Sequence, residues 1–282
     1  MSVDRLQERI RKTKNPSVFY LEALPQWLPE SYGREDLPAS MEAYFQQLLE
    51  TLKDTVPAVR FGYGSFALMG QPGLALLDGL MQKAKDLGYY VLLDGPELMT
   101  PASAANAAQL LADYPLDGIV VSGYLGSDVL LPLRQLCQKG KTVFVLCRTS
   151  NKSAVEVQDL LTGGRHVHTA AADIVARCAE PVIGKCGYSQ MGILAAASSA
   201  QSLSTLRGKF SKLFLLLDGS DYPNANAKNC SNAFDRLGHG AAACAGESIA
   251  AAWKEGEGDP LESALQAALR MKKNLTRYIT VL

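Results

Sequence analysis

Residues 89–100 read YYVLLDGPELMT, and the rest of the chain can be ordered around this stretch. Tyr89 to Leu93 is an uninterrupted apolar run, typical of a strand that is buried on both faces. The run ends at Asp94, which is followed by Gly95 and Pro96. An acidic side chain at the end of a buried strand is costly unless it has partners or a function, and parallel α/β proteins bind ligands at this end of their strands. We therefore expect any chemistry of this protein to lie near Asp94.

Similar apolar runs recur along the chain, and each is followed by a segment with a helical pattern. We expect strands at residues 18–21, 58–62, 89–93, 117–122, 142–147, 181–184, 213–217 and 240–244. We expect helices at residues 4–14, 41–52, 73–87, 102–112, 129–137, 153–161, 169–179, 193–206, 227–237, 247–254 and 260–273. Strands that alternate with helices form a parallel sheet, because the connections cross over.

Eight such units in about 250 residues predict a closed (βα)8 barrel, the TIM-barrel form of an α/β protein. No linker interrupts the pattern, so we expect one domain over residues 1–282. The alternative is an open, doubly wound sheet. Its Gly-x-Gly-x-x-Gly signature does not follow the first predicted strand.

The composition excludes several classes of protein. Lys plus Arg and Asp plus Glu number 28 each, so no basic excess indicates nucleic-acid binding. No apolar run reaches the roughly 18 residues of a membrane span, and the charged start lacks the apolar core of a signal peptide. The six cysteines include no Cys-x-x-Cys pair, which favours reduced thiols in a cytoplasmic protein. A net charge of zero does little to oppose self-association.

Two segments carry a specific resemblance: DGIVVSGYLGSDVLLPL at residues 117–133 and VFVLCRTSNKSAVEVQ at residues 143–158. They resemble the long-form (type 2) orotidine 5'-phosphate decarboxylases of bacteria. That family carries a Pro-Tyr-Leu-Gly turn after its fourth strand, and a Thr-Ser-Asn-Pro segment with a downstream Gln after its fifth. The turn here is GYLG at residues 123–126, and the segment is TSNK at residues 149–152, followed by Gln158. The resemblance can be followed more weakly from residue 4 to about residue 249.

The resemblance implies a (βα)8 barrel that acts as a homodimer and needs no cofactor. The family decarboxylates orotidine monophosphate to UMP, the last step of pyrimidine synthesis. A nucleotide-like small molecule is therefore the implied ligand.

The catalytic motif of the family is Asp-x-Lys-x-x-Asp at the end of the third strand. Its lysine stabilises the developing carbanion and then protonates it. Asp94 matches the first aspartate, whereas Pro96 stands at the lysine position and Met99 at the second aspartate. Arg60 stands where the second strand of the family has a lysine, and arginine does not readily release a proton. The resemblance thus implies catalytic positions at Asp94 and Arg60, with decarboxylation lost or altered.

Other family positions have also changed. Glu22 replaces an aspartate that faces the ribose, and Ser150 matches a residue that binds the pyrimidine. Lys185 lies in the segment aligned with a Gly-Ala-Thr after the sixth strand. Gly219 is the one glycine retained from the phosphate-binding loop of the family, which here contains Asp221 and Pro223. Glu247 is aligned with an arginine that binds the phosphate in the family. The resemblance implies substrate contacts by Glu22, Ser150, Lys185 and Gly219, at a weakened phosphate site.

Several candidate side chains also have an alternative interpretation. Arg60, Arg148 and Lys185 either form a basic floor for an anion or neutralise the carboxylates of Glu22, Asp94 and Asp218, and we favour neutralisation. Cys186 beside Lys185 is a candidate nucleophile, but buried packing is the commoner role of a free cysteine. His166 and His168 lack a third ligand close in the sequence, so surface histidines are a better interpretation than a metal site.

Three functions remain open. The first is a non-catalytic homologue with a structural, regulatory or ligand-binding role. The second is an active lyase that uses a displaced catalytic set. The third is an enzyme of different chemistry on the same barrel, because a fold does not fix a function. For the homodimer, Met99 provides an apolar side chain where the family places an aspartate that reaches the partner's site.

Overall fold

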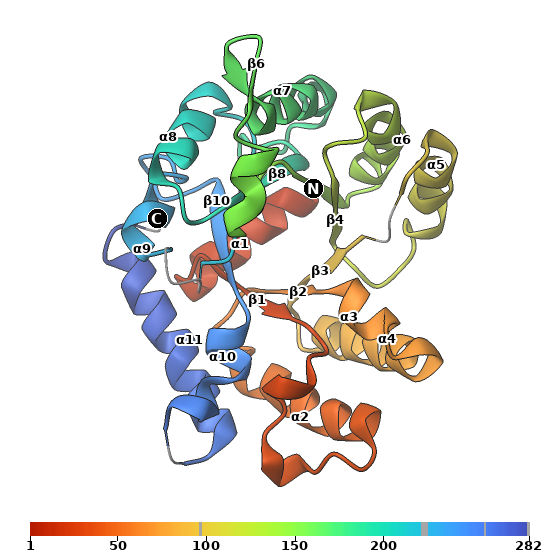
Figure 1. The fold of residues 1–282 in the computed structure, drawn as a ribbon, viewed down its shortest axis with the longest axis vertical. Helices are drawn as coiled ribbons and strands as arrows, with labels where there is room; N and C mark the ends of the chain where they lie inside the picture. Colours follow the sequence, from red (N-terminus) through yellow and green to blue (C-terminus); the bar gives the residue numbers. More distant parts are fainter. Residues whose placement is uncertain (96–97, 221–224, 257, 281–282) are drawn as a thin grey trace.

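The structure, a computed structural model, describes residues 1–95, 98–220, 225–256 and 258–280. In these ranges, eight parallel strands close into a barrel in the order β1-β10-β9-β8-β5-β4-β3-β2, as Figure 1 shows. The barrel strands are β1 (Ser17–Leu21), β2 (Ala58–Phe61), β3 (Tyr90–Asp94), β4 (Gly118–Ser122), β5 (Thr142–Leu146), β8 (Met191–Ala196), β9 (Leu215–Asp218) and β10 (Ala241–Ala245). The predicted closed barrel is confirmed.

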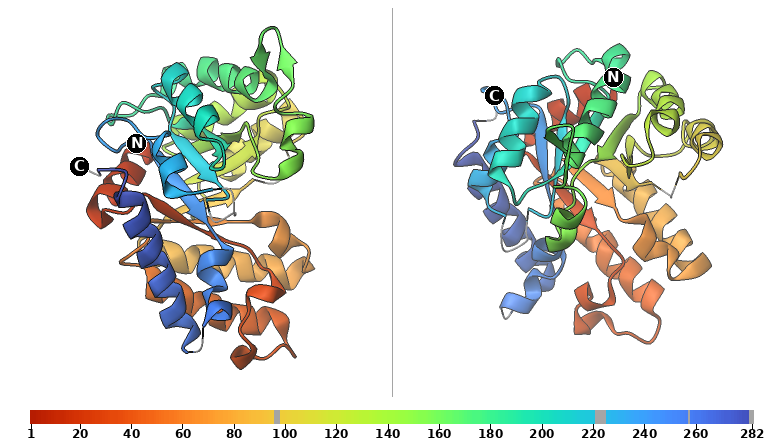
Figure 2. Two further views of the ribbon diagram at one scale, coloured as in Figure 1. Left: turned by 60° about the vertical axis from the view of Figure 1, so that its left-hand side comes forward. Right: turned by 45° about the horizontal axis from the view of Figure 1, so that its top comes forward.

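Helices surround the barrel, and segments far apart in the sequence pack together (Figure 2). The helices are α1 (Ser2–Thr13), α2 (Leu37–Leu52), α3 (Tyr63–Ala67), α4 (Gly70–Asp86), α5 (Pro101–Leu110), α6 (Ser127–Gln138), α7 (Val167–Ala179), α8 (Ala200–Lys209), α9 (Ala227–Ser231), α10 (Glu247–Ala250) and α11 (Pro260–Thr276). The last of these, α11, packs against α2 near the start of the chain. In the described part of the chain, no helix has both the length and the apolar character needed to cross a membrane.

The strands are apolar without interruption because both of their faces are buried. In β3, Tyr90 and Leu92 belong to the cluster inside the barrel, whereas Val91 and Leu93 belong to the cluster between barrel and helices. This two-residue alternation holds around the barrel, as expected for a strand. It also decides which side chains can reach the mouth, the face formed by the carboxyl ends of the strands.

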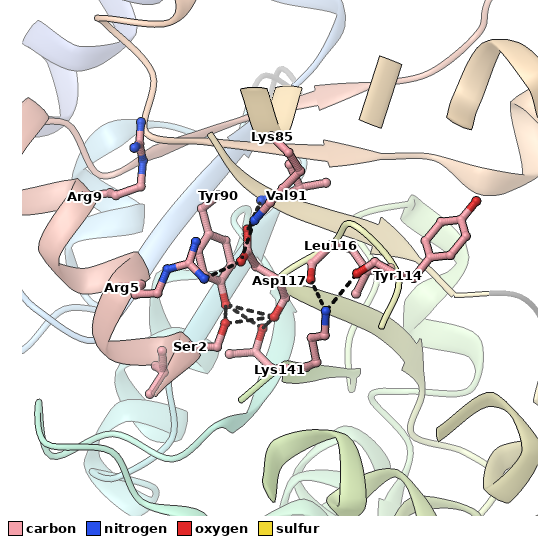
Figure 3. Close-up of polar contacts among 12 residues, drawn as sticks. Ser2, Arg5, Arg9, Lys85, Tyr90, Val91, Tyr114, Leu116, Asp117 and Lys141 are labelled. Carbon is pink, nitrogen blue, oxygen red and sulfur yellow. Dashed lines mark hydrogen bonds and ion pairs between the residues drawn. The ribbon is translucent and has the colours of Figure 1, made fainter. Parts of the chain in front are cut away.

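Helix α1 closes the bottom of the barrel, the face formed by the amino ends of the strands. It is held there through Asp117, which is 2% exposed. The Asp117 carboxylate lies 2.9 Å from Arg5 Nη1, 2.9 Å from Lys85 Nζ and 2.9 Å from the backbone N of Val91, which donates to it. Ser2 Oγ donates to the Asp117 carbonyl oxygen at 2.9 Å. Figure 3 shows these groups converging on Asp117 from α1, α4 and β3.

The predicted sixth strand at residues 181–184 is wrong. Glu180–Val182 forms a 3-10 helix, and Ile183 makes only an isolated bridge to Ser189. The sixth barrel strand is β8, which lies partly within the segment predicted as a helix at residues 193–206. Helix α8 begins only at Ala200.

The composition of β8 explains this error. Its sequence, MGILAA, is rich in small residues that have a low strand preference, and all six residues are buried. A Cβ at Gly192 would lie 2.5 Å from the carbonyl oxygen of Phe214 and 2.8 Å from the ring of Phe144. Crowding inside the barrel therefore selects glycine at this position, where strands usually favour a β-branched residue.

The predicted helix at residues 153–161 is also wrong. A 3-10 helix at Lys152–Glu156 is followed by a hairpin of β6 (Leu161–Thr162) and β7 (Arg165–His166), seen at the top of Figure 1. The two-residue turn between these strands, 163–164, is Gly-Gly, and both glycines have positive φ, of 57° and 77°. Such a turn is a strong hairpin signal.

Candidate site at the barrel mouth

Three strand ends bring one cation and two carboxylates together at the mouth. Arg60 of β2 pairs with Asp94 of β3, with Nε 2.5 Å from Oδ1 and Nη2 2.9 Å from Oδ2. Arg60 Nη1 also donates to Asp218 Oδ1 of β9 at 2.7 Å. Arg60 is only 5% exposed, whereas the two carboxylates are more open. The prediction that Arg60 neutralises nearby carboxylates is therefore confirmed for Asp94 and Asp218.

Tyr20 completes this cluster, although the sequence analysis did not single it out. Its ring centroid lies 4.3 Å from Arg60 Cζ, and its hydroxyl donates to Asp94 Oδ2 at 3.1 Å. The signal was present in β1, because the alternation that turns Val18 inward also turns Tyr20 and Glu22 toward the mouth. Gly62 allows the close packing, since a Cβ there would lie 2.8 Å from Glu22 Cγ.

Burial and neighbouring charges shift the pKa values of Arg60, Tyr20 and Glu22 in this cluster. Burial alone would lower the pKa of Arg60, but Asp94 and Asp218 outweigh it, so its pKa lies well above the usual value. Burial raises the pKa of Tyr20, and Asp94 raises it further. Burial also raises the pKa of Glu22. A hydrogen bond with Tyr20 lowers this pKa in part, and the charge of Asp94 raises it further. Arg60 is thus a fixed cation, while the surroundings of Glu22 favour its protonated form.

Two hollows lie on either side of Arg60. The first, of about 340 Å³, lies toward β3, β4 and β5 and is mainly apolar. It is lined by Arg60, Asp94, Gly95, Leu98, Met99, Val120, Val121, Ser122, Leu125, Val129, Leu146 and Leu194. The second, of about 300 Å³, lies toward β1, β9 and β10. It is lined by Tyr20, Glu22, Leu24, Trp27, Arg60, Asp218, Gly219, Cys244, Gly246 and Glu247.

The charges of the second hollow disfavour an anionic ligand. Three of its described lining residues are acidic: Glu22, Asp218 and Glu247. Arg60 is the one cation among the described residues that line either hollow, and its charge is shared between two aspartates. Glu247 also lies 3.4 Å from Lys254 Nζ, outside the hollow.

Ser150 and Gly219 lie at the mouth as the sequence predicts, and they are structurally engaged. Ser150 Oγ donates to the backbone carbonyl oxygen of Asp218 at 2.6 Å, so it ties the loop after β5 to β9. Gly219 has a positive φ of 65° and lines the second hollow. Arg148 does not join the cluster, because its guanidinium forms a two-point pair with Asp159 at 2.9 Å and 2.9 Å.

The predicted mouth position of Lys185 is wrong. The error follows from the misplaced sixth strand, because residues 181–184 precede the true strand. Lys185 is exposed in a turn at the bottom of the barrel, where the neighbouring Cys186 N donates to Asp4 Oδ1 of α1 at 2.8 Å. Burial raises the pKa of the Cys186 thiol to about 11, which disfavours a nucleophilic thiolate.

The two histidines differ from the predicted surface pair. His166 is exposed, but His168 is buried, and its Nδ1 lies 3.0 Å from the carbonyl oxygen of Gln158. Their rings stack with centroids 5.2 Å apart. Among the described residues, no group of three or more His, Cys, Asp or Glu side chains is arranged to hold a metal ion.

Some motif positions cannot be placed. Pro96, Asp221 and Pro223 lie outside the described residues. Met99 is described: it is 67% exposed and lines the edge of the first hollow.

Comparison with known proteins identifies the family of this barrel. No protein-family model matches the chain. The orotidine 5'-phosphate decarboxylase of Deinococcus radiodurans is 30% identical over 243 residues, covering 84% of this chain and 86% of the relative. The enzyme of the same name from Clostridium novyi is 26% identical over 285 residues, covering 98% of both chains.

Solved structures show the same fold. Leishmania donovani OMP decarboxylase superposes with a TM-score of 0.76 at 21% identity, covering 97% of this chain and 98% of that one. The orotidine 5'-monophosphate decarboxylase of Methanocaldococcus jannaschii, complexed with the inhibitor BMP, superposes with a TM-score of 0.63 at 17% identity, covering 93% and 99%. Because the chain shares this sequence identity with the named relatives over most of its length, and has the same closed barrel, it belongs to the orotidine 5'-phosphate decarboxylase family.

Proposed function

We propose that this chain is a member of the family that does not decarboxylate orotidine 5'-phosphate and that acts as a ligand-binding or regulatory homologue. The observation that carries this proposal is the state of Arg60. Its guanidinium is buried, permanently charged and held by Asp94 and Asp218 at distances of 2.5 to 2.9 Å. A cation held in this way cannot protonate a carbanion, since arginine does not readily give up a proton.

The motif positions support the same conclusion. The resemblance places the catalytic lysine at position 96, where this chain has proline, and the second aspartate at position 99, where it has methionine. Proline has no proton to donate. The described residues that line the two hollows of the mouth include no other lysine to take its place.

The proposed ligand is a small molecule bound in the mouth. The hollows, of about 340 Å³ and 300 Å³, are in the range of small-ligand sites. The structural neighbour from Methanocaldococcus jannaschii is complexed with BMP, so a nucleotide-like ligand is the starting expectation. The acidic side chains Glu22, Asp218 and Glu247 oppose a phosphate in the second hollow, which favours a ligand without one.

A turnover assay tests this proposal. Purified protein is incubated with orotidine monophosphate, and UMP is measured beside an active decarboxylase as positive control. We expect no measurable UMP. A turnover near one per second, an ordinary enzymatic rate, would contradict the proposal. In that case, Arg60→Lys and Asp94→Asn would show whether the activity comes from the mouth.

The alternative is an enzyme of different chemistry, and the raised pKa of Glu22 favours it. Its raised pKa beside Tyr20 suits a general acid or base. If a reaction is found, Glu22→Gln should abolish it at all pH values. A reaction that Glu22→Gln leaves intact would remove the basis for this alternative.

The proposal also includes a single domain over residues 1–282, a homodimer and a cytoplasmic location. A dimer contact at α5 is supported by two apolar side chains near its start and end, Met99 and Leu110, each 67% exposed.

Six free cysteines, five of them buried, support a reducing compartment.

A further inference from the structure

Ser202, His168 and Asp159 form a hydrogen-bonded series that is separate from the cluster around Arg60. Ser202 lies in the first turn of α8, His168 in the first turn of α7, and Asp159 in the turn before β6. Ser202 Oγ is 3.3 Å from His168 Nε2, and His168 Nδ1 is 3.2 Å from Asp159 Oδ1. A serine, a histidine and a carboxylate joined in this order are the arrangement that activates a serine as a nucleophile.

The contacts of His168 determine which ring nitrogen carries the proton. Nδ1 faces two acceptors, the Asp159 carboxylate and the backbone carbonyl oxygen of Gln158, which lies at 3.0 Å. The neutral ring therefore carries its proton on Nδ1 and presents the lone pair of Nε2 to the Ser202 hydroxyl. Burial lowers the pKa of His168, against smaller increases from Gln158 and Asp159, which favours the neutral ring at neutral pH. A neutral Nε2 is the state that can accept a proton from serine.

Asp159 is held in place by Arg148. The guanidinium donates from Nε to Oδ1 and from Nη2 to Oδ2, both at 2.9 Å. These hydrogen bonds lower the pKa of Asp159, so the carboxylate is charged at neutral pH. A fixed carboxylate orients the imidazole and stabilises the imidazolium that forms when the serine gives up its proton.

The serine lies nearer the surface than its histidine. Ser202 is half-buried and the neighbouring Gln201 is exposed, whereas His168 is only 4% exposed. Ser199 caps the helix by accepting from Ser202 N at 3.2 Å. The N–H groups of Ala200 and Gln201, at the start of α8, have no acceptor within the helix. Backbone N–H groups of this kind stabilise the oxyanion of a tetrahedral intermediate.

We propose that Ser202 is a nucleophile that reacts with carboxylic esters, with His168 as its general base and Asp159 as the residue that positions His168. Ser202 Oγ attacks the ester carbonyl carbon, and its proton passes to His168 Nε2. The tetrahedral intermediate then expels the alcohol, which takes this proton, and an acyl group remains on Ser202. Water attacks the acyl group, gives a proton to His168 and releases the carboxylic acid, and the proton returns to Ser202 Oγ. None of the three residues lines the hollows of the mouth, so the inference does not rest on the proposed function.

Labelling of the full chain with diisopropyl fluorophosphate tests the inference. An activated serine displaces fluoride from the phosphorus of this reagent, and peptide mass spectrometry locates the adduct. We expect an adduct at Ser202 that forms at a constant rate around neutral pH and more slowly at acidic pH, where His168 becomes protonated. His166 and Arg148 lower the pKa of His168, and Asp159 raises it. Asp159→Asn should therefore slow labelling and move the pH profile toward acidic pH.

Matched variants assign the roles. Ser202→Ala should remove the adduct, whereas Ser204→Ala, an exposed change on the same helix, should leave it unchanged. His168→Gln should slow labelling by about 100-fold or more, with its melting temperature measured to confirm folding. Absence of an adduct at Ser202 with millimolar reagent, or equal labelling of wild type and His168→Gln, would overturn the inference.

Ester hydrolysis gives a second measurement that needs no histidine variant. Wild type and Ser204→Ala should hydrolyse para-nitrophenyl acetate at the same rate, and both should be faster than Ser202→Ala. Nonspecific reaction with surface lysines and histidines is common to all three proteins, so the difference reports on Ser202. Equal rates in wild type and Ser202→Ala would also overturn the inference.

Discussion

Arg60 and Asp94 form a two-point ion pair across neighbouring strands of the barrel, with contacts of 2.5 Å and 2.9 Å. The pair lies where the resemblance places the reacting groups of the family. Asp218 accepts a third hydrogen bond from the same guanidinium, so three strands are tied together at the mouth. The cluster is therefore expected to stabilise the barrel, whatever ligand it binds.

Removing Arg60 should destabilise the protein strongly. Arg60→Ala leaves Asp94 and Asp218 without their partner, and breaking a buried ion pair in this way costs about 3 to 5 kcal/mol. The free energy of unfolding measured by urea titration checks the prediction. Lys53→Ala is the control, because it removes an exposed pair with Glu50 and should change the stability little. Equal effects of the two substitutions would show that the mouth cluster is not a stability element.

The stability of the protein should depend on pH through Glu22. Because the pKa of Glu22 is raised in the folded protein by burial and by Asp94, folding favours its protonated form. Its contribution is present in full below its pKa in the unfolded chain and is lost as the pH rises through its folded-state pKa. Glu22→Gln should therefore be more stable than wild type at neutral pH, with a difference that shrinks toward acidic pH.

Urea titrations of both proteins from acidic to neutral pH measure this difference. Glu50→Gln serves as a control of opposite sign, because Lys53 and Lys83 lower the pKa of Glu50. Wild-type Glu50 should stabilise the protein at neutral pH and lose this effect as the pH falls. A pH-independent difference for Glu22→Gln would contradict the burial of its carboxyl group.

Much of this site could be predicted from the sequence, because strand ends in a parallel barrel meet at one face. Arg60, Asp94 and Asp218 each follow an apolar run, so their meeting was implied by the alternation of strands and helices. Tyr20 was missed because it lies inside the first apolar run. It is recognised as part of the site only when the two-residue alternation is followed through the strand.

The position of Lys185 could not be predicted correctly, because it depends on how the sixth strand packs inside the barrel. The sixth strand is made of glycine, alanine and larger apolar residues selected by the rings around them, and Gly192 has no space for a Cβ beside Phe144. The apolar residues 181–184 before it fit a strand pattern better, and a strand there would put Lys185 at the mouth, whereas Lys185 lies at the bottom. Close packing of this kind depends on residues distant in the sequence.

Removing the charge of Asp117 should loosen α1 from the bottom of the barrel. Asp117→Asn can still accept from Val91 N, but it loses its ion pairs with Arg5 and Lys85, at a cost of about 3 kcal/mol or more for a buried pair. Hydrogen exchange of the α1 amides should accelerate more than that of the barrel strands. Asp113→Asn, an exposed change in the loop before β4, is the control. Unchanged protection of α1 in Asp117→Asn would show that its apolar contacts suffice.

The last prediction concerns the homodimer. Met99 is 67% exposed in the single chain, beside the first hollow and just before α5, and α5 is rich in small residues that permit close approach. An exposed methionine at this place is explained if a second copy covers it, with a total buried area above about 1,000 Å². Met99→Lys would then place a charge in the contact and should shift the protein from dimer to monomer.

Sedimentation equilibrium at micromolar concentration measures the mass of wild type and variant. Leu237→Lys is the matched control: Leu237 is also exposed, at 51%, and lies just before β10 at the bottom of the barrel, away from the predicted contact. It should leave the dimer intact. A monomeric wild type would contradict the proposed assembly, and Met99 would then be an exposed side chain at the edge of its own hollow. A dimer that both substitutions leave unchanged would place the interface elsewhere, and the role proposed for Met99 would be wrong.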